Sequence, residues 1–269
     1  MIRKFGRAVA FGVGAGATRA VYGELRRRSP GGASRWERTN YAGRTVHLGA
    51  GPAVAVGAAL GALPSRTRGA AALAVLAAGA CGAYDDVVGA GDPRRGFRAH
   101  LSALRDGEVT SGAVKLFGIS AAGLAAGALL KERPVDRFLA GMVIAGTAHF
   151  VNLVDVRPGR ATAAVLTLGA PGLLRKGPAG VLSAASVGAA AAVLPDDVAE
   201  RTMIGDAGAH ALGAALGAAI VAGNGRAGLV AHAAGLVAAA VYGDKVSELA
   251  RQVGETDQRK WTGAPTVVS

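Results

Sequence analysis

Charged residues in this chain gather in short stretches that separate long apolar segments. The apolar segments cover about residues 5–23, 46–63, 69–84, 113–130, 135–154, 161–174, 177–194, 207–223 and 227–243. A helix needs about 20 mostly apolar residues to cross the ~30 Å hydrocarbon core of a bilayer. The pattern therefore predicts an all-α, polytopic integral membrane protein with about nine transmembrane helices, in a range of roughly eight to ten.

The composition agrees with a membrane protein. Of 269 residues, 51% are hydrophobic and only 18% are charged, whereas about 25% are charged in soluble domains. The apolar segments are rich in alanine and glycine, and such small residues let membrane helices approach closely. We expect close approach at Gly57-x-x-x-Gly61 and Gly213-x-x-x-Gly217, with chance spacing of glycines as the alternative. The short sixth segment contains Pro171 and is predicted to be tilted or broken, or to merge with the seventh.

The chain shows no second domain and no long internal repeat. Residues 1–243 are therefore expected to form a single transmembrane helical domain, whose first helix is retained rather than cleaved as a signal. Residues 244–269 form a charged tail that is predicted to begin as an amphipathic helix. Val246, Leu249 and Val253 would lie on one side of it, together with Ala250.

Nine spans would place the two ends of the chain on opposite sides of the membrane. The loops 24–45, 85–112, 155–160 and 195–206 would then share one face with the tail. That face carries 17 lysines and arginines, against 11 on the other. Because positive residues concentrate in cytoplasmic loops, the first face is predicted to be cytoplasmic.

The net charge of +12 would suit a nucleic-acid partner, but the basic residues sit in short loops between apolar segments. Only six Phe, two Trp and four Tyr are available for base stacking. We therefore expect no nucleic acid, and instead anionic lipid head groups or an anionic substrate. The single cysteine, Cys81, excludes an internal disulfide.

The longest polar interruption begins with adjacent acids, Asp85 and Asp86, directly after an apolar segment. Two carboxylates where an apolar helix meets water are costly unless a cation needs them. A divalent metal that carries phosphates is such a cation. Arg94, Arg95 and Arg98 follow and could face the phosphates. The alternative is an ordinary solvated helix end.

Further polar groups fall on the same predicted face. Asn40 precedes the second segment, and Asn152 and Asp155 close the fifth with an i,i+3 spacing that puts both side chains on one helix face. Asp206 opens the eighth segment between two glycines. The free N–H groups at this helix start could hold a phosphate, and the alternative is that Asp206 simply caps the helix. For Asn152 and Asp155, the alternative is that both are simply polar residues at a helix end.

The histidines give a weaker signal. His149 lies one turn before Asn152 and is interpreted as a hydrogen-bonded core histidine. His100, His210 and His232 show no spacing that is typical of metal ligands.

Three motifs in this order, YDD, NLVD and IGDAGAHALG, together with RTNYAGRTVH before the second segment, resemble the polyprenyl-phosphate N-acetylhexosamine-1-phosphate transferase superfamily, glycosyltransferase family 4. Its members include the bacterial phospho-N-acetylmuramoyl-pentapeptide transferase and the undecaprenyl-phosphate GlcNAc-1-phosphate transferase. The resemblance covers about Arg38 to Val241. It implies a multi-pass enzyme of the bacterial plasma membrane, in some cases a homodimer, with its active-site loops in the cytoplasm.

The resemblance also implies a reaction and a set of roles. The enzyme would move a sugar-1-phosphate from a UDP-sugar to a polyprenyl phosphate, such as undecaprenyl phosphate, and release UMP in cell-wall (peptidoglycan) biogenesis. The catalytic residues would be Asp85, Asp86 and Asp206, of which the first two activate or position the lipid phosphate. Mg²⁺ would be held by Asn152 and Asp206. Substrate binding would fall to Asn40, Arg94, Arg95, Arg98, Lys115 and Asp155.

The chain departs from the family pattern in three places. After Asp155 the family usually continues with Gly and a second Asp-Gly, whereas this chain reads Val156-Arg157-Pro158-Gly159-Arg160. His149 stands where an asparagine is usual. A late histidine-rich motif has no counterpart. These departures leave open a degenerate homologue that binds polyprenyl phosphate or a membrane partner without turnover. A transporter is a third reading, which is disfavoured because the acids lie at helix ends rather than mid-span.

Overall fold

The structure is a computed structural model that describes residues 2–92, 94 and 96–253. Helices make up most of this part. They are α1 Ile2–Arg28, α2 Ala50–Gly61, α3 Arg68–Val88, α4 Gly96–Arg105, α5 Ser111–Leu130, α6 Pro134–Leu153, α7 Arg160–Leu173, α8 Pro178–Val198, α9 Gly205–Gly223, α10 Arg226–Val241 and α11 Gly243–Gln252. The predicted all-α class is confirmed, with one short hairpin as an addition.

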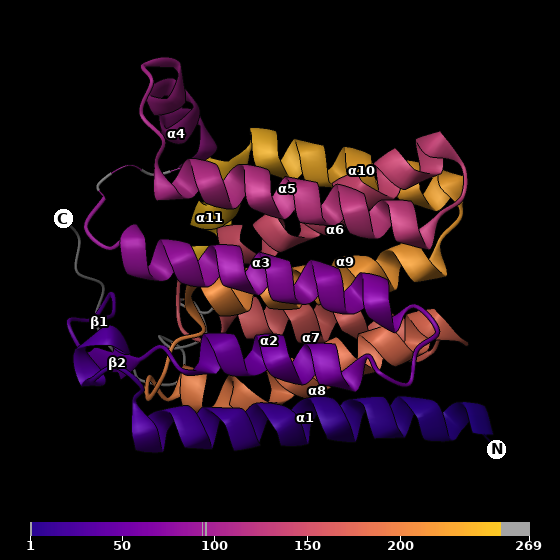
Figure 1. The fold of residues 1–269 in the computed structure, drawn as a ribbon, viewed down its shortest axis with the longest axis horizontal. Helices are drawn as coiled ribbons and strands as arrows, with labels where there is room; N and C mark the ends of the chain where they lie inside the picture. Colours follow the sequence, from indigo (N-terminus) through magenta and orange to yellow (C-terminus); the bar gives the residue numbers. More distant parts are fainter. Residues whose placement is uncertain (1, 93, 95, 254–269) are drawn as a thin grey trace.

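The long helices run side by side, so that the helix ends gather at two ends of one bundle (Figure 1). Each of the nine predicted apolar segments falls on one helix, from α1 to α3 and from α5 to α10. Four helices, α3, α5, α8 and α9, are long and apolar enough to cross a membrane. The pair α10–α11, bent by 85°, adds a fifth if it counts as one span. The described chain thus has the helices of a membrane protein, while nine crossings remain a prediction.

Helix α9 forms the centre of the bundle, and 83% of the residues in its most apolar stretch are buried. It packs against α2, α3, α6 and α8, and small residues permit this. A Cβ at Gly213 would lie 2.6 Å from Ala148 Cα, and one at Gly217 would lie 2.8 Å from Ile144 Cα. Alanine at either position would therefore push α9 away from α6, which confirms the predicted close approach at this glycine pair.

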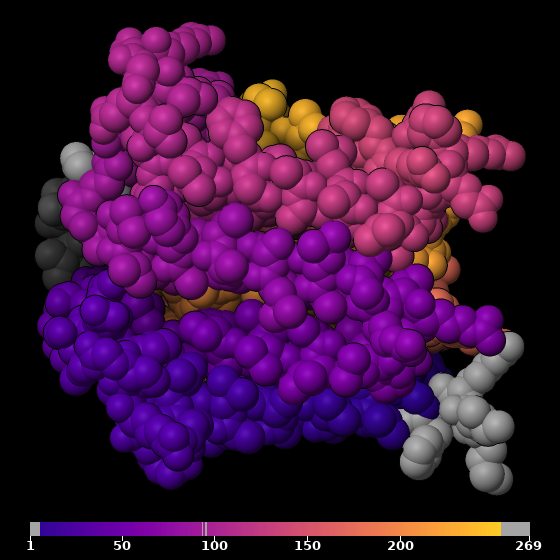
Figure 2. Space-filling model, viewed as in Figure 1, coloured from indigo at the N-terminus to yellow at the C-terminus, as the bar shows by residue number. Residues whose placement is uncertain are grey.

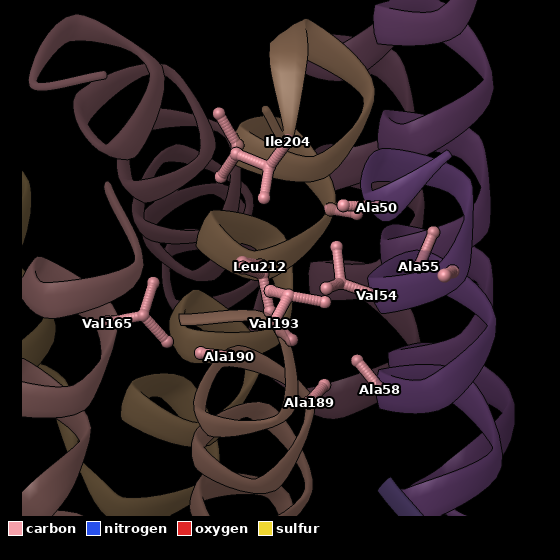
Figure 3. Close-up of a cluster of buried hydrophobic side chains, with 14 of the residues drawn as sticks. Ala50, Val54, Ala55, Ala58, Val165, Ala189, Ala190, Val193, Ile204 and Leu212 are labelled. Carbon is pink, nitrogen blue, oxygen red and sulfur yellow. The ribbon is translucent and has the colours of Figure 1, made fainter. Parts of the chain in front are cut away.

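The same packing joins α1 and α2. A Cβ at Gly57 would lie 2.6 Å from Gly14 O, and one at Gly61 would lie 2.8 Å from Ala10 O. Next to this contact, Val54, Val193 and Leu212 interdigitate between α2, α8 and α9 with small alanines around them (Figure 3). The core of the bundle therefore combines many short side chains and close backbones with a smaller number of buried leucine, isoleucine and valine residues.

A short antiparallel hairpin precedes α2 and was not predicted. Its strands are β1 Glu37–Thr39 and β2 Thr45–His47, after the 3₁₀ turn η1 Ala33–Arg35. In the turn, the Asn40 side-chain oxygen accepts the N–H groups of Ala42 (3.0 Å) and Arg44 (2.9 Å), which is a typical Asx turn. Because residues 45–47 pair as a strand, the helix begins at Ala50 and not at residue 46 as predicted.

The sixth and seventh segments are two separate helices, α7 and α8. Pro171 lies in the last turn of α7, which ends at Leu173, so the proline neither breaks the segment in its middle nor lets it merge with the next. Gly177 then turns the chain with a φ of 68°, a conformation that favours glycine. Helix α8 continues to Val198, beyond the predicted end.

The tail does begin as a helix, α11. Its Ser247 hydroxyl donates to the Leu153 carbonyl at the end of α6 (2.8 Å), which holds α11 against the bundle. Leu249 and Val253, on the predicted apolar side, remain 61% and 63% exposed. At the same end of the bundle, α4 stands out sideways from the other helices (Figures 1 and 2).

Candidate functional site

Three helices bring their polar ends together at one end of the bundle. The last turn of α3 carries Asp85 and Asp86, the second turn of α5 carries Lys115, and the first turn of α9 carries Asp206. A Cβ at Gly82 would collide with the backbone carbonyl of Asp206. This glycine therefore allows α3 to approach the start of α9 closely enough for the acidic side chains to meet.

Lys115 lies between two carboxylates. Its Nζ is 2.5 Å from Asp85 Oδ2 and also contacts Asp206 Oδ2. The three side chains are only 15%, 17% and 26% exposed, in the order Lys115, Asp85, Asp206. Coulomb attraction is strong in such a partly buried setting. Lys115, a predicted substrate-binding residue, thus neutralises two of the predicted catalytic acids in this structure.

Asp86 has a different environment from its neighbour. Its Oδ1 accepts the N–H of Asp206 (3.0 Å), and its Oδ2 accepts the N–H of Ala207 (2.9 Å). The first N–H groups of a helix have no partner within it, and a negative charge is favourable at that end. Asp86 therefore caps α9 from another helix, and the interpretation of Asp206 as the cap is wrong.

Gly205 makes this cap possible. It begins α9 with a φ of 57°, and a Cβ there would lie 2.9 Å from Asp86 Oδ2. A larger residue would be strained and would also displace the capping carboxylate. The glycine before Asp206, part of the motif found in the sequence, has this backbone role.

The hairpin holds the chain segment that leads into α9. Arg38 Nη2 donates to the backbone oxygen of Asp86 (2.7 Å), and the N–H of Met203 donates to the carbonyl of His47 (3.2 Å). Asn40 Nδ2 donates to Glu200 Oε2 (2.5 Å). The predicted substrate-binding residue Asn40 thus uses its side-chain oxygen in the turn and its amide on Glu200, which gives it a positioning role here.

The carboxyl of Asp155 interacts electrostatically with the other acidic residues of the site. Burial raises the pKa of the Asp155 carboxyl well above its usual value, and the negative charges of Asp197, Asp206 and Asp86 raise it further. Asp197, at the end of α8, accepts hydrogen bonds from Gly159 N–H and the Thr162 hydroxyl, both at 3.2 Å. A carboxyl in such surroundings favours its neutral form.

The predicted arginines take different positions. Arg94 forms ion pairs with Asp92 (2.9 Å) and Glu108 (2.7 Å), and the hydrogen bonds from its guanidinium group lower the pKa of both carboxyls. These pairs hold together the two ends of the segment that contains α4. Arg98 lines the cavity described next. Arg95 lies outside the described residues.

A cavity of about 620 Å³ opens between α4, α5, α6 and α10, next to the carboxylate–lysine cluster. Its polar lining residues are Arg98, His100, Lys115, His149, Asn152, His210 and Asp244. Its apolar lining residues include Leu116, Met142, Ala145, Leu236, Val237 and Ala240. Lys115 and Asn152 belong to helix ends, whereas Met142 lies about three turns inside α6. The cavity therefore has a charged mouth and an apolar interior.

The oxygen atoms of the site decide whether a magnesium ion could bind there. Within residues 2–92, 94 and 96–253, no group of three or more His, Cys, Asp or Glu is arranged to hold a metal ion. Mg²⁺ is often bound by one or two carboxylates together with substrate phosphates and waters. Asp85 and Asp206 already converge on one cation, the Lys115 ammonium, so their chemistry fits Mg²⁺ when a ligand supplies phosphate oxygens. Asn152, the other predicted ligand, lines the cavity.

Sequence reasoning missed two features. The capping role of Asp86 depends on α3 meeting α9, which no local pattern indicates. His210 could have been noticed, because it lies four residues after Asp206 and so on the same face of α9. His149 was interpreted as a hydrogen-bonded core residue, but its Nε2 is buried without a partner in the described part of the chain.

The site was also compared with known proteins. No protein-family model matches the chain, and no curated protein gives a significant match. The expected family therefore rests on the sequence motifs alone.

Proposed function

We propose that this protein transfers a sugar-1-phosphate from a UDP-sugar to a polyprenyl phosphate in a bacterial plasma membrane. The observation that carries the proposal is the convergence of Asp85, Lys115 and Asp206 from three helices beside the cavity. Phosphoryl transfer depends mainly on positioning and on neutralising charge, and this cluster offers both carboxylates for a cation and an ammonium group for phosphate.

In the proposed reaction, an oxygen of the lipid phosphate attacks the phosphorus that carries the sugar. A new phosphorus–oxygen bond forms, and the bond from that phosphorus to the bridging oxygen breaks. UMP leaves with the electron pair, and the lipid acquires a diphospho-sugar. Mg²⁺ bound to the diphosphate would supply charge neutralisation, held by Asp85 and Asp206, with Asn152 at the mouth of the cavity as a further oxygen ligand.

The cavity supports a lipid substrate. Lys115 and Arg98 at the mouth are suited to an anionic phosphate. Met142, Leu236 and Val237 line its interior and are suited to an isoprenoid chain, because burial of apolar surface is favourable. Helix α10, on which two of these residues lie, is at the edge of the bundle (Figure 1), so a lipid would enter from the side.

A second candidate is a protein that binds polyprenyl phosphate without turnover. One observation favours it: Lys115 already neutralises Asp85 and Asp206, and both oxygens of Asp86 accept backbone hydrogen bonds. In such a protein the lysine would stay in place and substitute for the metal.

One assay separates the two candidates. Purified full-length protein in lipid nanodiscs is incubated with undecaprenyl phosphate, Mg²⁺ and a panel of UDP-sugars, and UMP release is followed. UMP release with one sugar nucleotide, abolished by EDTA, supports the transferase. Binding of undecaprenyl phosphate with no UMP from any sugar nucleotide supports the binding protein. If neither binding nor release occurs, both candidates are wrong.

A further inference from the structure

Two imidazole rings meet in the cavity, about one turn deeper than the carboxylate–lysine cluster. His149 on α6 lies three residues before Asn152, and His210 on α9 lies four residues after Asp206. Their ring centroids are 5.4 Å apart and their planes are nearly perpendicular. Both rings line the same cavity as Lys115. The pair therefore sits between the charged mouth and the apolar interior.

Each ring has a polar atom without a partner. His210 is 0% exposed, and the Nε2 atoms of His210 and His149 are buried with no hydrogen-bond partner in the described part of the protein. Buried polar groups are nearly always hydrogen-bonded. Two such atoms on neighbouring rings that line a cavity indicate that a group bound in the cavity forms hydrogen bonds with both of them.

The positions of the protons on the two histidine rings limit which hydrogen-bonding groups can bind between them. His210 Nδ1 lies 2.7 Å from the backbone oxygen of Asp206. Because a carbonyl can only accept, Nδ1 carries the proton, and Nε2 of the neutral ring is left as an acceptor. His149 Nε2 can present an N–H. An O–H group between the rings would donate to His210 and accept from His149, and so would satisfy both.

Two simpler occupants are less suitable. A transition metal bound by imidazoles usually has three or more protein ligands, and residues 2–92, 94 and 96–253 hold no such group. A single water would satisfy the two nitrogens. However, the cavity of about 620 Å³ is many times the ~30 Å³ that one water occupies in the liquid. The volume and the neighbouring ammonium favour a larger, anionic ligand.

We propose that the His149–His210 pair binds an O–H group of the phosphate-bearing ligand whose anionic part lies at Lys115. The inference rests on the proposed function, which supplies two ligands with this chemistry. One is the UDP-sugar, through a hydroxyl of its sugar. The other is the polyprenyl phosphate, through a protonated phosphate oxygen. In both, the O–H lies near an anionic phosphate, as the imidazole pair lies near the lysine.

The test measures binding of each ligand separately to full-length protein in nanodiscs with Mg²⁺. The probes are UDP-N-acetylglucosamine and undecaprenyl phosphate. His210→Phe keeps a ring of similar size and removes the acceptor, so it is expected to weaken one of the two ligands about tenfold. The ligand that is weakened identifies the source of the O–H. His232→Phe, at an exposed histidine of α10, is the matched control and should leave both affinities unchanged.

A second pair of variants covers the case in which His210→Phe fails to fold. His149→Asn keeps a side-chain N–H donor and should retain binding within about twofold, whereas His149→Leu removes it and should weaken the same ligand. A purely structural histidine would not distinguish these two replacements by ligand affinity. Equal affinities in the parent and in all folded variants would mean that the pair holds only water, which overturns the inference and leaves the proposed function intact. A parent protein that binds neither ligand would overturn both.

Discussion

The two ends of the bundle treat their charged side chains differently. At one end, Lys115 is shared by Asp85 and Asp206 and is only 15% exposed. At the other end, Asp136 at the start of α6 pairs with Arg226 at the start of α10 at 2.6 Å, and the arginine is 49% exposed. Water can replace a partner at the exposed end but much less at the enclosed one. The carboxylates at both ends are largely buried, at 17% exposed for Asp85 and for Asp136, so the difference lies in the cation: Lys115 is enclosed, whereas Arg226 is half-exposed. The comparison teaches that the first of these two ion pairs keeps its cation inside the protein, where a ligand can use it.

The largest effect is expected from the removal of the enclosed cation. Lys115→Met leaves Asp85 and Asp206 facing each other without a counter-charge. Loss of one member of a buried ion pair costs about 3–5 kcal/mol, and partial exposure reduces this to about 2–4 kcal/mol here. Thermal unfolding in detergent should therefore show a clear loss of stability, together with loss of ligand binding.

Arg226→Met is the matched control at the other end of the bundle. It removes a cation from an exposed ion pair, so thermal unfolding should change little. Equal losses for the Lys115 and Arg226 variants would contradict the difference between the two ends.

A smaller effect is expected at the helix cap. Asp86→Ala leaves the N–H groups of Asp206 and Ala207 without their acceptors and should destabilise the protein by about 1–3 kcal/mol. Asp86→Asn keeps one acceptor oxygen, and asparagine caps helices about as well as aspartate, so its loss should be smaller. Hydrogen exchange of the first turn of α9 reports the cap directly. Unchanged protection in Asp86→Ala would show that this carboxylate does not hold the helix start.

The smallest effect concerns the pH dependence of stability. Burial and the neighbouring carboxylates raise the pKa of Asp155 in the folded protein above its unfolded value of about 3.9. The folded state then binds the proton more tightly, so this contribution to stability is full below the unfolded pKa. It is lost as the pH rises through the folded pKa.

The measurement compares the parent with Asp155→Asn. The melting temperature of the parent is expected to fall relative to that of the variant as the pH is raised from about 4. Parallel melting profiles of the two proteins across this range would mean that Asp155 is solvated and does not feel the charges of Asp197 and Asp206.

Much of the fold could be predicted, because the apolar segments are long and each became one helix. The glycine pair of α9 was predicted to permit close approach, and Gly213 does lie against Ala148. The hairpin at residues 37–47 was missed because its strands have only three residues each and are held by Asn40 and by contacts to residues 200–203. Such non-local partners leave no periodic pattern in the sequence.

The sequence predicted which residues form the site, but not which of them contact one another. The motifs selected Asp85, Asp86 and Asp206, and the structure brings them together with Lys115. Which acid pairs with the lysine and which caps α9 depends on the angle at which α3 meets α9, and adjacent residues on a helix point in different directions. Asp85 and Asp86 are neighbours in the sequence and still have different partners for this reason.

The central claim is that Asp206 supplies a charge for phosphoryl transfer, and one measurement tests it most directly. Asp206 does not cap α9, and Lys115 keeps Asp85 as a counter-charge when Asp206 is neutralised. Asp206→Asn should therefore keep the protein folded while it removes the carboxylate charge that a hard cation requires. The account predicts that Mg²⁺-dependent UMP release from the UDP-sugar falls at least about 100-fold, whereas Asp136→Asn at the opposite end of the bundle leaves the rate unchanged. A folded Asp206→Asn protein that releases UMP at the parent rate would contradict the account.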